Sequence, residues 1–331
     1  MVRMNGVDLR QFQFDYDMAW AALFLHGDGT VYARYGSRNA DGPMVTNSAK
    51  GLVTTMRLVL RAHAEYPKNR ERFLSKRGPE PRFGRPEDYP HLESRRAVSR
   101  VTPGNCIHCH NVHEAFHDLQ KREGGGPGSV FKYPFPANAG FEIEPDSGIR
   151  VVSVRPASPA AAAGLEPGDT ILAMNGQVIL SLADIQFVLH HLSGEADVEV
   201  SLERGGRSLE AMLRLDGDWR RNDFTWRVSL SGYASDPAYY LRMLRASEKD
   251  RLGIGEERLA LEVEGLFTPV ARGSGLERGD IIVSVDGRTE KLSAPRFHAY
   301  MRVHHSTPTT TAQMDVLRRG ERLGVEVRYF E

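Results

Sequence analysis

The sequence predicts an α+β fold with several domains, in which two small β-barrels with capping helices follow a small α/β unit and an irregular segment. The 331 residues are enough for two or three domains, since a domain usually has roughly 100–200 residues. Residues 164–176 align without a gap on residues 275–287, which indicates an internal repeat of one module. Hydrophobic residues make up 40% of the chain and charged residues 26%, a balance typical of globular proteins.

Charge, hydropathy and the number of cysteines argue against three classes of protein. The chain has 43 Lys and Arg and 43 Asp and Glu, and the lack of a basic excess argues against a nucleic-acid-binding protein. No apolar run approaches the roughly 20 residues that cross a bilayer, so we expect no transmembrane segment in this chain. Cys106 and Cys109 are the two cysteines, which excludes a scaffold held by several disulfides.

The first predicted unit spans residues 1–66. Residues 18–25 indicate a buried strand, and Asp28-Gly29 indicates a hairpin turn that leads to a return strand, because this dipeptide accepts positive φ angles. Residues 49–65 carry apolar side chains at helical spacing and predict a helix that covers one face of the hairpin. The predicted apolar stripe consists of Leu52, Met56, Val59, Leu60 and His63.

An irregular segment follows at residues 67–137. Prolines between residues 67 and 90 and a glycine-rich run at residues 124–128 disfavour long helices and strands. We expect one short helix in this segment, over residues 106–122.

Residues 138–215 and 253–331 form the two copies of the repeated module. Each copy contains an apolar strand that ends in an Asn-Gly or Asp-Gly turn, followed by a predicted helix at residues 181–192 or 294–304. A Trp- and Arg-rich connector, residues 216–252, joins the copies. Nucleic-acid stacking is one interpretation of its composition, and stacking of arginine on tryptophan, which would fix the orientation of the modules, is the favoured one.

The motifs of the first module carry a resemblance to a known family. These motifs are Ser158-Pro159-Ala160, Pro167-Gly168-Asp169 and Asn175-Gly176. With them, residues 138–215 resemble a PDZ domain of the circularly permuted type that follows bacterial periplasmic proteases of the high-temperature-requirement family. Residues 253–331 resemble the same domain in a divergent form.

The resemblance implies that the modules bind extended peptides or protein C-termini, because such a module adds a partner's chain as a strand and cradles its carboxylate with N–H groups. In the first module the implied peptide-binding residues are Gly140, Phe141, Glu142 and Ile143. In the second module residues 252–255 and residues 258–261 are the alternatives. The competing interpretation is that both modules pack internally and bind no peptide.

No catalytic motif accompanies the modules. The chain has no Gly-x-Ser-x-Gly segment, which marks one class of serine hydrolase, and we recognise no trypsin-like domain before the repeats. Whether the chain is an enzyme is therefore uncertain, and the sequence favours electron transfer over substrate turnover.

The segment Cys-Ile-His-Cys-His at residues 106–110 fits the pattern for covalent attachment of haem c. Thiols of Cys106 and Cys109 would reach the two haem vinyl groups, and His110 would ligate the haem iron. A redox dithiol with Cys106 as nucleophile is one alternative. Zinc is another, and its ligands would be Cys106, Cys109, His113 and His117.

Residues 20–38 are similar to the second half of a thioredoxin-like domain, which makes residues 1–66 a partial thioredoxin-like unit. The order of this unit, the Cys-x-x-Cys-His segment and the PDZ-like repeats is similar to that in multidomain proteins of planctomycete-type bacteria. This resemblance implies that an upstream segment, with any export signal, is missing from the chain. The alternative is that residues 1–66 form an intact small α/β unit.

Together these features predict a periplasmic or otherwise extracytoplasmic protein with haem c, which serves as a redox or scaffold protein and docks protein partners through its PDZ-like domains. Attachment of haem c normally takes place outside the cytoplasm, so this prediction requires export. The alternatives are a non-enzymatic adaptor with structural zinc at the Cys/His cluster, and a thiol–disulfide oxidoreductase.

Overall fold

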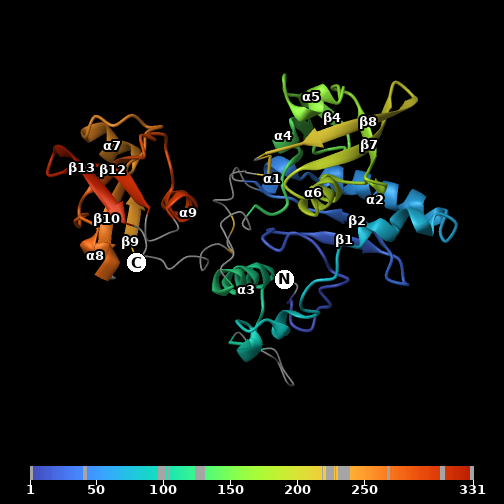
Figure 1. Ribbon diagram of the computed structural model, residues 1–331, viewed down its shortest axis with the longest axis horizontal. Helices are drawn as coiled ribbons and strands as arrows, with labels where there is room; N and C mark the ends of the chain where they lie inside the picture. Colours follow the sequence, from blue (N-terminus) through green and yellow to red (C-terminus); the bar gives the residue numbers. More distant parts are fainter. Residues whose placement is uncertain are drawn as a thin grey trace. The chain divides into compact units, whose positions relative to one another are not determined.

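The structure is a computed structural model that describes residues 3–39, 43–95, 102, 104–123, 131–217, 219–220, 227, 229, 239–266, 269–305 and 310–328. Contacts divide the chain into two units, Met1–Leu119 with Gly128–Phe224 and Gln120–Pro127 with Thr225–Glu331. The first unit holds the N-terminal part and the first module, and the second unit holds the second module (Figure 1). Within the described residues, no helix combines the length and the apolar character needed to cross a membrane.

A two-stranded antiparallel hairpin, β1 (Ala22–Leu25) and β2 (Val31–Tyr35), begins the first unit. The long helix α2 (Ala49–Ala64) follows, and the side chain of Ser48 accepts a hydrogen bond from the Gly51 N–H at its start, as an N-cap residue does. The short helices around them are α1 (Pro43–Thr46), η1 (Arg70–Lys76), η2 (Pro86–Asp88) and η3 (Glu93–Arg95). The predicted hairpin and helix are present, but a pair of strands and one helix do not show a thioredoxin-like domain.

The buried face of α2 differs from the predicted apolar stripe. Gly51, Thr55 and Val59 are buried, whereas Met56 and Leu60 are 45% and 64% exposed. The helix packs most closely at Gly51, where a β-carbon would lie 2.1 Å from the Pro145 carbonyl oxygen of the first module and 2.9 Å from the Tyr35 hydroxyl of the hairpin. The closeness of this contact, rather than hydrophobicity, decides which face of the helix is buried.

The irregular segment packs on the beginning of the chain. Its helix α3 (Cys109–Arg122) starts at the second cysteine, and the Met4 N–H donates to the Ile107 carbonyl at 2.9 Å. A core cluster joins Leu9 to Ile107 and Val112. The cysteine segment is therefore fixed to the first residues of the chain.

The first module consists of two small open sheets and three helices. One sheet pairs β3 (Phe141–Ile143) with β4 (Val151–Val154). The other has the order β6-β5-β7-β8, with β5 (Thr170–Met174), β6 (Gln177–Val178), β7 (Ala196–Arg204) and β8 (Arg207–Leu215). The helices are α4 (Pro136–Ala139), α5 (Pro159–Ala162) and α6 (Leu182–His190). The strands do not form the predicted barrel, because they pair in two separate sheets.

The second module has one open sheet with the strand order β13-β12-β11-β10-β9. Its strands are β9 (Tyr239–Met243), β10 (Leu261–Leu266), β11 (Ile281–Val285), β12 (Thr311–Arg318) and β13 (Glu321–Arg328). Its helices are α7 (Ala246–Arg251), α8 (Pro269–Gly273) and α9 (Ala294–His304). The predicted boundary at residue 253 is too late, because β9 pairs with β10 and so belongs to this module.

Part of the predicted connector, including Asp218 and residues 221–226, lies outside the described residues. Trp219 is 7% exposed, and its indole N–H donates to the Gly194 carbonyl at 2.7 Å. The guanidinium carbon of Arg220 lies 5.4 Å from the centre of the Trp219 ring. Arginine does contact tryptophan here, but the contact lies within the first unit.

Candidate functional site

The predicted peptide-binding strand of the first module is β3, whose side chains divide between core and solvent. Phe141 and Ile143 are 1% and 7% exposed, and both belong to a core cluster that includes Ile185 of α6. Glu142 is exposed and accepts a hydrogen bond from the Ser153 hydroxyl at 2.7 Å. The apolar side chains of β3 thus fill the module, so only its main chain and Glu142 face a partner.

Gly140 ends α4 and turns the chain into β3. Its φ of 95° lies in the left-handed region, and a β-carbon at this position would lie 2.1 Å from the Ser158 hydroxyl oxygen. Glycine is required by both the backbone angle and the close approach. The Gly140 N–H donates to the Ala137 carbonyl at 3.1 Å, so it closes the turn instead of pointing toward a peptide carboxylate.

The main chain of β3 has one open edge. The Arg155 N–H donates to the Gly140 carbonyl at 2.8 Å, and Phe141 lies opposite Val154. This pattern makes the Phe141–Val154 pair a non-hydrogen-bonded one, so the N–H and carbonyl of Phe141 point away from β4. Within the described part of the chain no strand pairs with this edge, which leaves it able to accept an added strand.

The helix of this module, α6, is held on one side by the N-terminal part. Asp184 is fully buried, and its carboxylate lies 2.6 Å from the ammonium of Lys76. The same carboxylate accepts a hydrogen bond from the Arg34 main-chain N–H at 3.2 Å, and the Arg34 guanidinium lies 3.5 Å from the centre of the Phe187 ring. Burial lowers the pKa of Lys76 to about 8, although Asp184 acts in the opposite direction. This side of α6 is closed to a partner.

Residues 131–135 cover a second side of α6. The Gln186 amide donates to the Tyr133 carbonyl at 3.1 Å, and the rings of Tyr133 and His190 stack with their centres 4.0 Å apart. Burial lowers the pKa of His190 well below its usual value, and nearby positive charges add to this effect. Arg220 donates to the His190 carbonyl at 3.0 Å and so caps the end of the helix.

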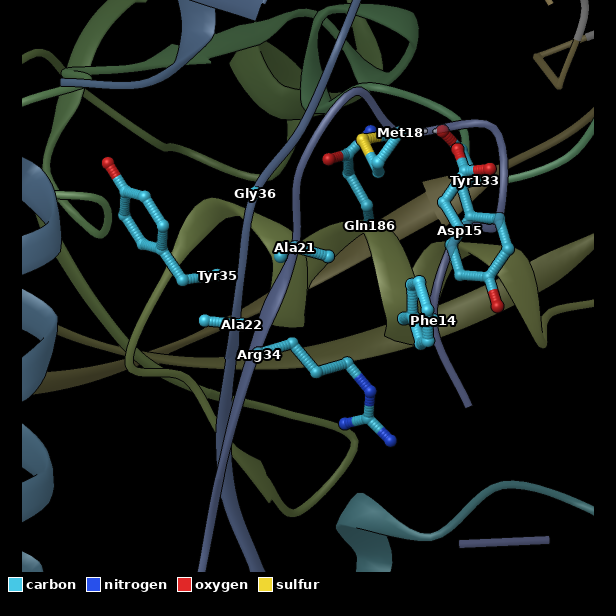
Figure 2. A pocket seen from close by; sticks show the side chains of 11 residues that line it. Phe14, Asp15, Met18, Ala21, Ala22, Arg34, Tyr35, Gly36, Tyr133 and Gln186 are labelled. Carbon is cyan, nitrogen blue, oxygen red and sulfur yellow. Dashed lines mark hydrogen bonds between the residues drawn. The ribbon is translucent and has the colours of Figure 1, made fainter. Parts of the chain in front are cut away.

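A small pocket lies between the N-terminal segment and α6 (Figure 2). Its lining includes Asp15 and Met18 from the N-terminal segment, Arg34 from β2 and Gln186 from α6. The pocket therefore lies inside the first unit, where the N-terminal part and the first module share one interior.

β9 takes the place of β3 in the second module. The Leu244 N–H donates to the Ala260 carbonyl at 3.1 Å, and Met243 lies opposite Leu261. The Met243–Leu261 pair is therefore a non-hydrogen-bonded one, and the N–H and carbonyl of Met243 point away from β10. Tyr240 and Met243 are 63% and 44% exposed, so this edge is more open than that of β3.

The two segments predicted to receive a peptide in the second module lie elsewhere. Residues 252–255 follow α7, and residues 258–261 lead into β10, the inner neighbour of β9. Sequence reasoning missed β9 because its counterpart motif, a glycine before the strand, is absent at Ala238-Tyr239.

α9 is covered less than α6. Phe297 and Met301 are buried in the core of the second module, whereas Arg296 and Tyr300 are partly exposed and His304 is exposed. In α6, by contrast, seven of the nine residues are buried. Among the side chains that the structure describes, those of α6 are thus mostly enclosed, whereas those of α9 are partly exposed.

The cysteine segment is only partly open. Cys106 and Cys109 lie at half-buried positions, and burial raises the pKa of the Cys109 thiol, which disfavours its reactive thiolate form. Ile107 between them has no exposed surface, and the side chain of His110 is 35% exposed. These contacts do not test attachment of haem c at Cys106, Cys109 and His110, which stays a prediction.

The structure does not bring the predicted zinc ligands together. Among the described residues, the group of ligand atoms that converge within 4.8 Å is formed by Asp15, Asp17 and His113, without either cysteine. His113 faces Asp15 because its Nε2 accepts a hydrogen bond from the Tyr16 main-chain N–H at 3.2 Å. The ligand atoms of Cys106, Cys109, His113 and His117 do not converge in this structure, and zinc binding by this set stays a prediction. Sequence reasoning missed the two aspartates because they precede the histidine by nearly 100 residues.

The family model for the PDZ domain matches residues 122–215. The predicted PDZ domain of the first module is confirmed. The second module lies outside the matched residues, so its assignment to the family stays a prediction.

Several curated relatives are periplasmic serine proteases. The "Probable periplasmic serine endoprotease DegP-like" of Halomonas elongata is 29% identical over 36% of this chain and 29% of its own length. The "Probable periplasmic serine protease do/HhoA-like" of Haemophilus influenzae is 30% identical over 44% of this chain and 29% of its own length. The "Periplasmic pH-dependent serine endoprotease DegQ" of Escherichia coli is 26% identical over 44% of this chain and 30% of its own length. The chain spans about three tenths of the length of these relatives.

Solved structures of the same class are also similar to this chain. The serine endoprotease from Yersinia pestis is 30% identical with a TM-score of 0.20, over 21% of this chain and 27% of that chain. The HtrA-type protease AlgW with a decapeptide is 16% identical with a TM-score of 0.23, over 40% of this chain and 47% of that chain.

These relatives correct the predicted function. A haem-bearing redox or scaffold protein with an electron-transfer role is wrong, because the relatives are serine endoproteases. The zinc adaptor and the thiol–disulfide oxidoreductase fit them no better. The predicted similarity to proteases of the high-temperature-requirement family is confirmed, whereas the planctomycete type and the thioredoxin-like part are not shown.

Proposed function

We propose that this chain binds extended peptide segments, including protein C-termini, as the substrate-recognition part of a proteolytic system in the periplasm. The names of the relatives support the link to proteolysis and to the periplasm. The match to the PDZ domain supports peptide binding, because modules of this type add a peptide as a further strand.

The open edge of β9 is the observation that carries this proposal. The main-chain N–H and carbonyl of Met243 point away from the sheet, and the side chains of Tyr240 and Met243 present apolar surface beside them. A peptide strand placed there forms main-chain hydrogen bonds, which give affinity for any sequence, while the two side chains select among peptides. We assign the stronger site to this edge.

The edge of β3 is the weaker site. This edge is three residues long, Phe141, Glu142 and Ile143, and Gly140 turns the chain into it. The peptide would bind through the main chain of Phe141 and Ile143, with the side chain of Glu142 beside it. Because α6 is enclosed by the rest of the first unit, less of a peptide fits beside β3 than beside β9.

Peptide binding at β9 can be tested by removing one N–H group. A C-terminal peptide library is first selected on the full chain, and a fluorescein-labelled decapeptide from that selection is the probe. Met243→Pro removes an N–H that points outward and leaves the β9–β10 hydrogen bonds in place, a position where proline is tolerated. Met243→Ala is the matched control, since it removes the same side chain but keeps the N–H.

We expect Met243→Pro to weaken binding about tenfold relative to Met243→Ala, the equivalent of one hydrogen bond of about 1.4 kcal/mol. Fluorescence anisotropy measures the affinities, and circular dichroism checks that both variants fold. Equal affinities of the two variants would contradict binding at β9. A selection that yields no binding peptide would refute the proposed function.

A further inference from the structure

Three side chains of the metal-binding types meet where the N-terminal segment packs on α3. Asp15, Asp17 and His113 are 6%, 2% and 6% exposed, and one ligand atom of each lies within 4.8 Å of those of the other two. Two carboxylates and an imidazole form a mixed oxygen and nitrogen donor set, which suits zinc, manganese or ferrous iron. Folding assembles this set, because His113 and its neighbour Tyr16 are 97 residues apart in sequence.

The spacing of the three groups is close to that of a metal site. Ligand atoms held about 2.1 Å from one tetrahedral ion lie about 3.4 Å from one another. Nε2 of His113 and Oδ1 of Asp15 are 3.4 Å apart. The carboxylate of Asp17 lies within 4.8 Å of both, so a small rotation of its side chain completes the set.

The Nε2 atom of His113 faces the turn that holds both aspartates. It accepts a hydrogen bond from the Tyr16 N–H at 3.2 Å, and an ion bound at Nε2 would replace this hydrogen bond, because the ring nitrogen has one lone pair. The Asp17 N–H donates to Oδ1 of Asp15 at 3.2 Å, which holds the two aspartates in one turn.

The surroundings also favour an ion. The ring of Tyr16 lies 5.1 Å from that of His113, measured between centres, and shields one side of the site from water. Asp15 also lines the pocket of Figure 2. Two buried carboxylates placed together repel each other, and a divalent cation between them offsets this repulsion.

We propose that Asp15, Asp17 and His113 bind one divalent transition-metal ion, for which zinc is the first candidate, and that the ion fastens the N-terminal segment to α3. This site is separate from the cysteine segment and from the strand edges. It does not depend on the proposed function, and a failure of peptide binding leaves it unaffected.

Metal titration of the full chain tests the proposal. The protein is treated with a chelator, and isothermal titration with zinc and with manganese measures the affinity and the number of ions bound. Asp17→Asn and His113→Gln remove one ligand each with little change in size. Asp15→Asn repeats the test at the other carboxylate, so that the result does not depend on the folding of one variant. The double variant Cys106→Ser with Cys109→Ser is the control for binding by the thiols.

We expect one zinc ion per wild-type chain, and a loss of affinity of about a hundredfold or more in each ligand variant, since even groups behind the ligands change affinity 10–100-fold. The cysteine variant should bind as the wild type does. Zinc should raise the unfolding temperature of the wild type, because an ion that binds the folded state stabilises it, and should not raise that of Asp17→Asn. Absence of zinc and manganese binding by the wild type overturns the proposal, and so does binding that survives in the ligand variants or is lost in the cysteine variant.

Discussion

The two modules share one internal scaffold. In each, a buried aspartate accepts two hydrogen bonds from the guanidinium of an arginine in the last hairpin. Arg204 donates to Asp169 at 2.6 and 2.9 Å, and Arg318 donates to Asp280 at 2.8 and 2.7 Å. The same arginines donate to the carbonyls of Gly164 and Gly275. Charge-assisted bidentate pairs of this kind fix geometry as well as adding free energy, so both modules hold their turn and hairpin together in one way.

The modules differ in what surrounds the capping helix. Ser181 and Ser293 cap α6 and α9 in the same way, each accepting a hydrogen bond from the residue three positions along. That residue is the buried Asp184 in α6, paired with Lys76, and the partly exposed Arg296 in α9. The repeat thus encodes the strands and caps, while the outer face of the helix determines whether a module is built into a larger unit or presents an open edge.

The largest effect is expected where the helix is enclosed. Asp184→Ala leaves the Lys76 ammonium buried without its carboxylate and should lower the free energy of unfolding of the first unit by about 3–5 kcal/mol. Arg296→Ala, at the matching position of the second module, should change stability by less than about 0.5 kcal/mol. Urea unfolding followed by hydrogen exchange in each module measures both values. Similar losses in the two variants would remove the distinction between the helices.

An intermediate effect, equal in both modules, is expected for the shared scaffold. Arg204→Met and Arg318→Met each leave a buried aspartate without its forked partner and should destabilise their modules by similar amounts, smaller than the effect of Asp184→Ala because both arginines are partly exposed to solvent. Hydrogen-exchange mass spectrometry reads peptides of β7 and β12 separately. A loss of stability in one module that is several times the loss in the other would show that the two arginine–aspartate pairs are not equivalent.

The smallest effect is a difference in acid sensitivity. Burial alone would raise the pKa of Asp286, but hydrogen bonds from His305, Gln313 and Tyr300 outweigh burial and lower it. Since an unfolded aspartate has a pKa of about 3.9, the unfolded chain takes up the proton first on acidification. The stability that this carboxylate supplies above about pH 4 is therefore lost as the pH falls.

The first module has Asn175 at the matching position, where the amide oxygen accepts the Glu199 N–H at 2.9 Å, as Asp286 accepts the Gln313 N–H at 2.9 Å. Asparagine does not titrate, so Asp286→Asn should flatten the acid side of the stability profile of the second module. Asn175→Asp should introduce such a dependence in the first. Urea midpoints between about pH 3 and 7 check the slopes, and an unaltered slope in both variants would contradict the assignment.

Local chemistry made much of the scaffold predictable from the sequence. Asn175 and Asp286 adopt positive φ angles of 45° and 49° in the predicted turns, and α9 has the bounds predicted for it. Such features depend on neighbouring residues only. The PDZ domain could be predicted for the same reason, because its turn motifs are short and specific.

The rest depends on contacts between distant residues. Hydrophobic spacing predicted Met56 and Leu60 in the core, whereas the helix packs through Gly51, close to the Pro145 carbonyl and the Tyr35 hydroxyl, and leaves Met56 and Leu60 exposed. No local sequence pattern indicates that Asp15 and His113 lie close together in the fold. The predicted redox role rested on one five-residue segment, and the similarity to endoproteases outweighs it.

The buried pair of Lys76 and Asp184 also limits how this chain can evolve. Recombination that transferred the first module alone would leave Asp184 without Lys76 and would uncover the apolar flank of α6. The N-terminal part and the first module must therefore be inherited together, as a single cassette. The open flank of α9 places no such condition on the genetic shuffling of its module.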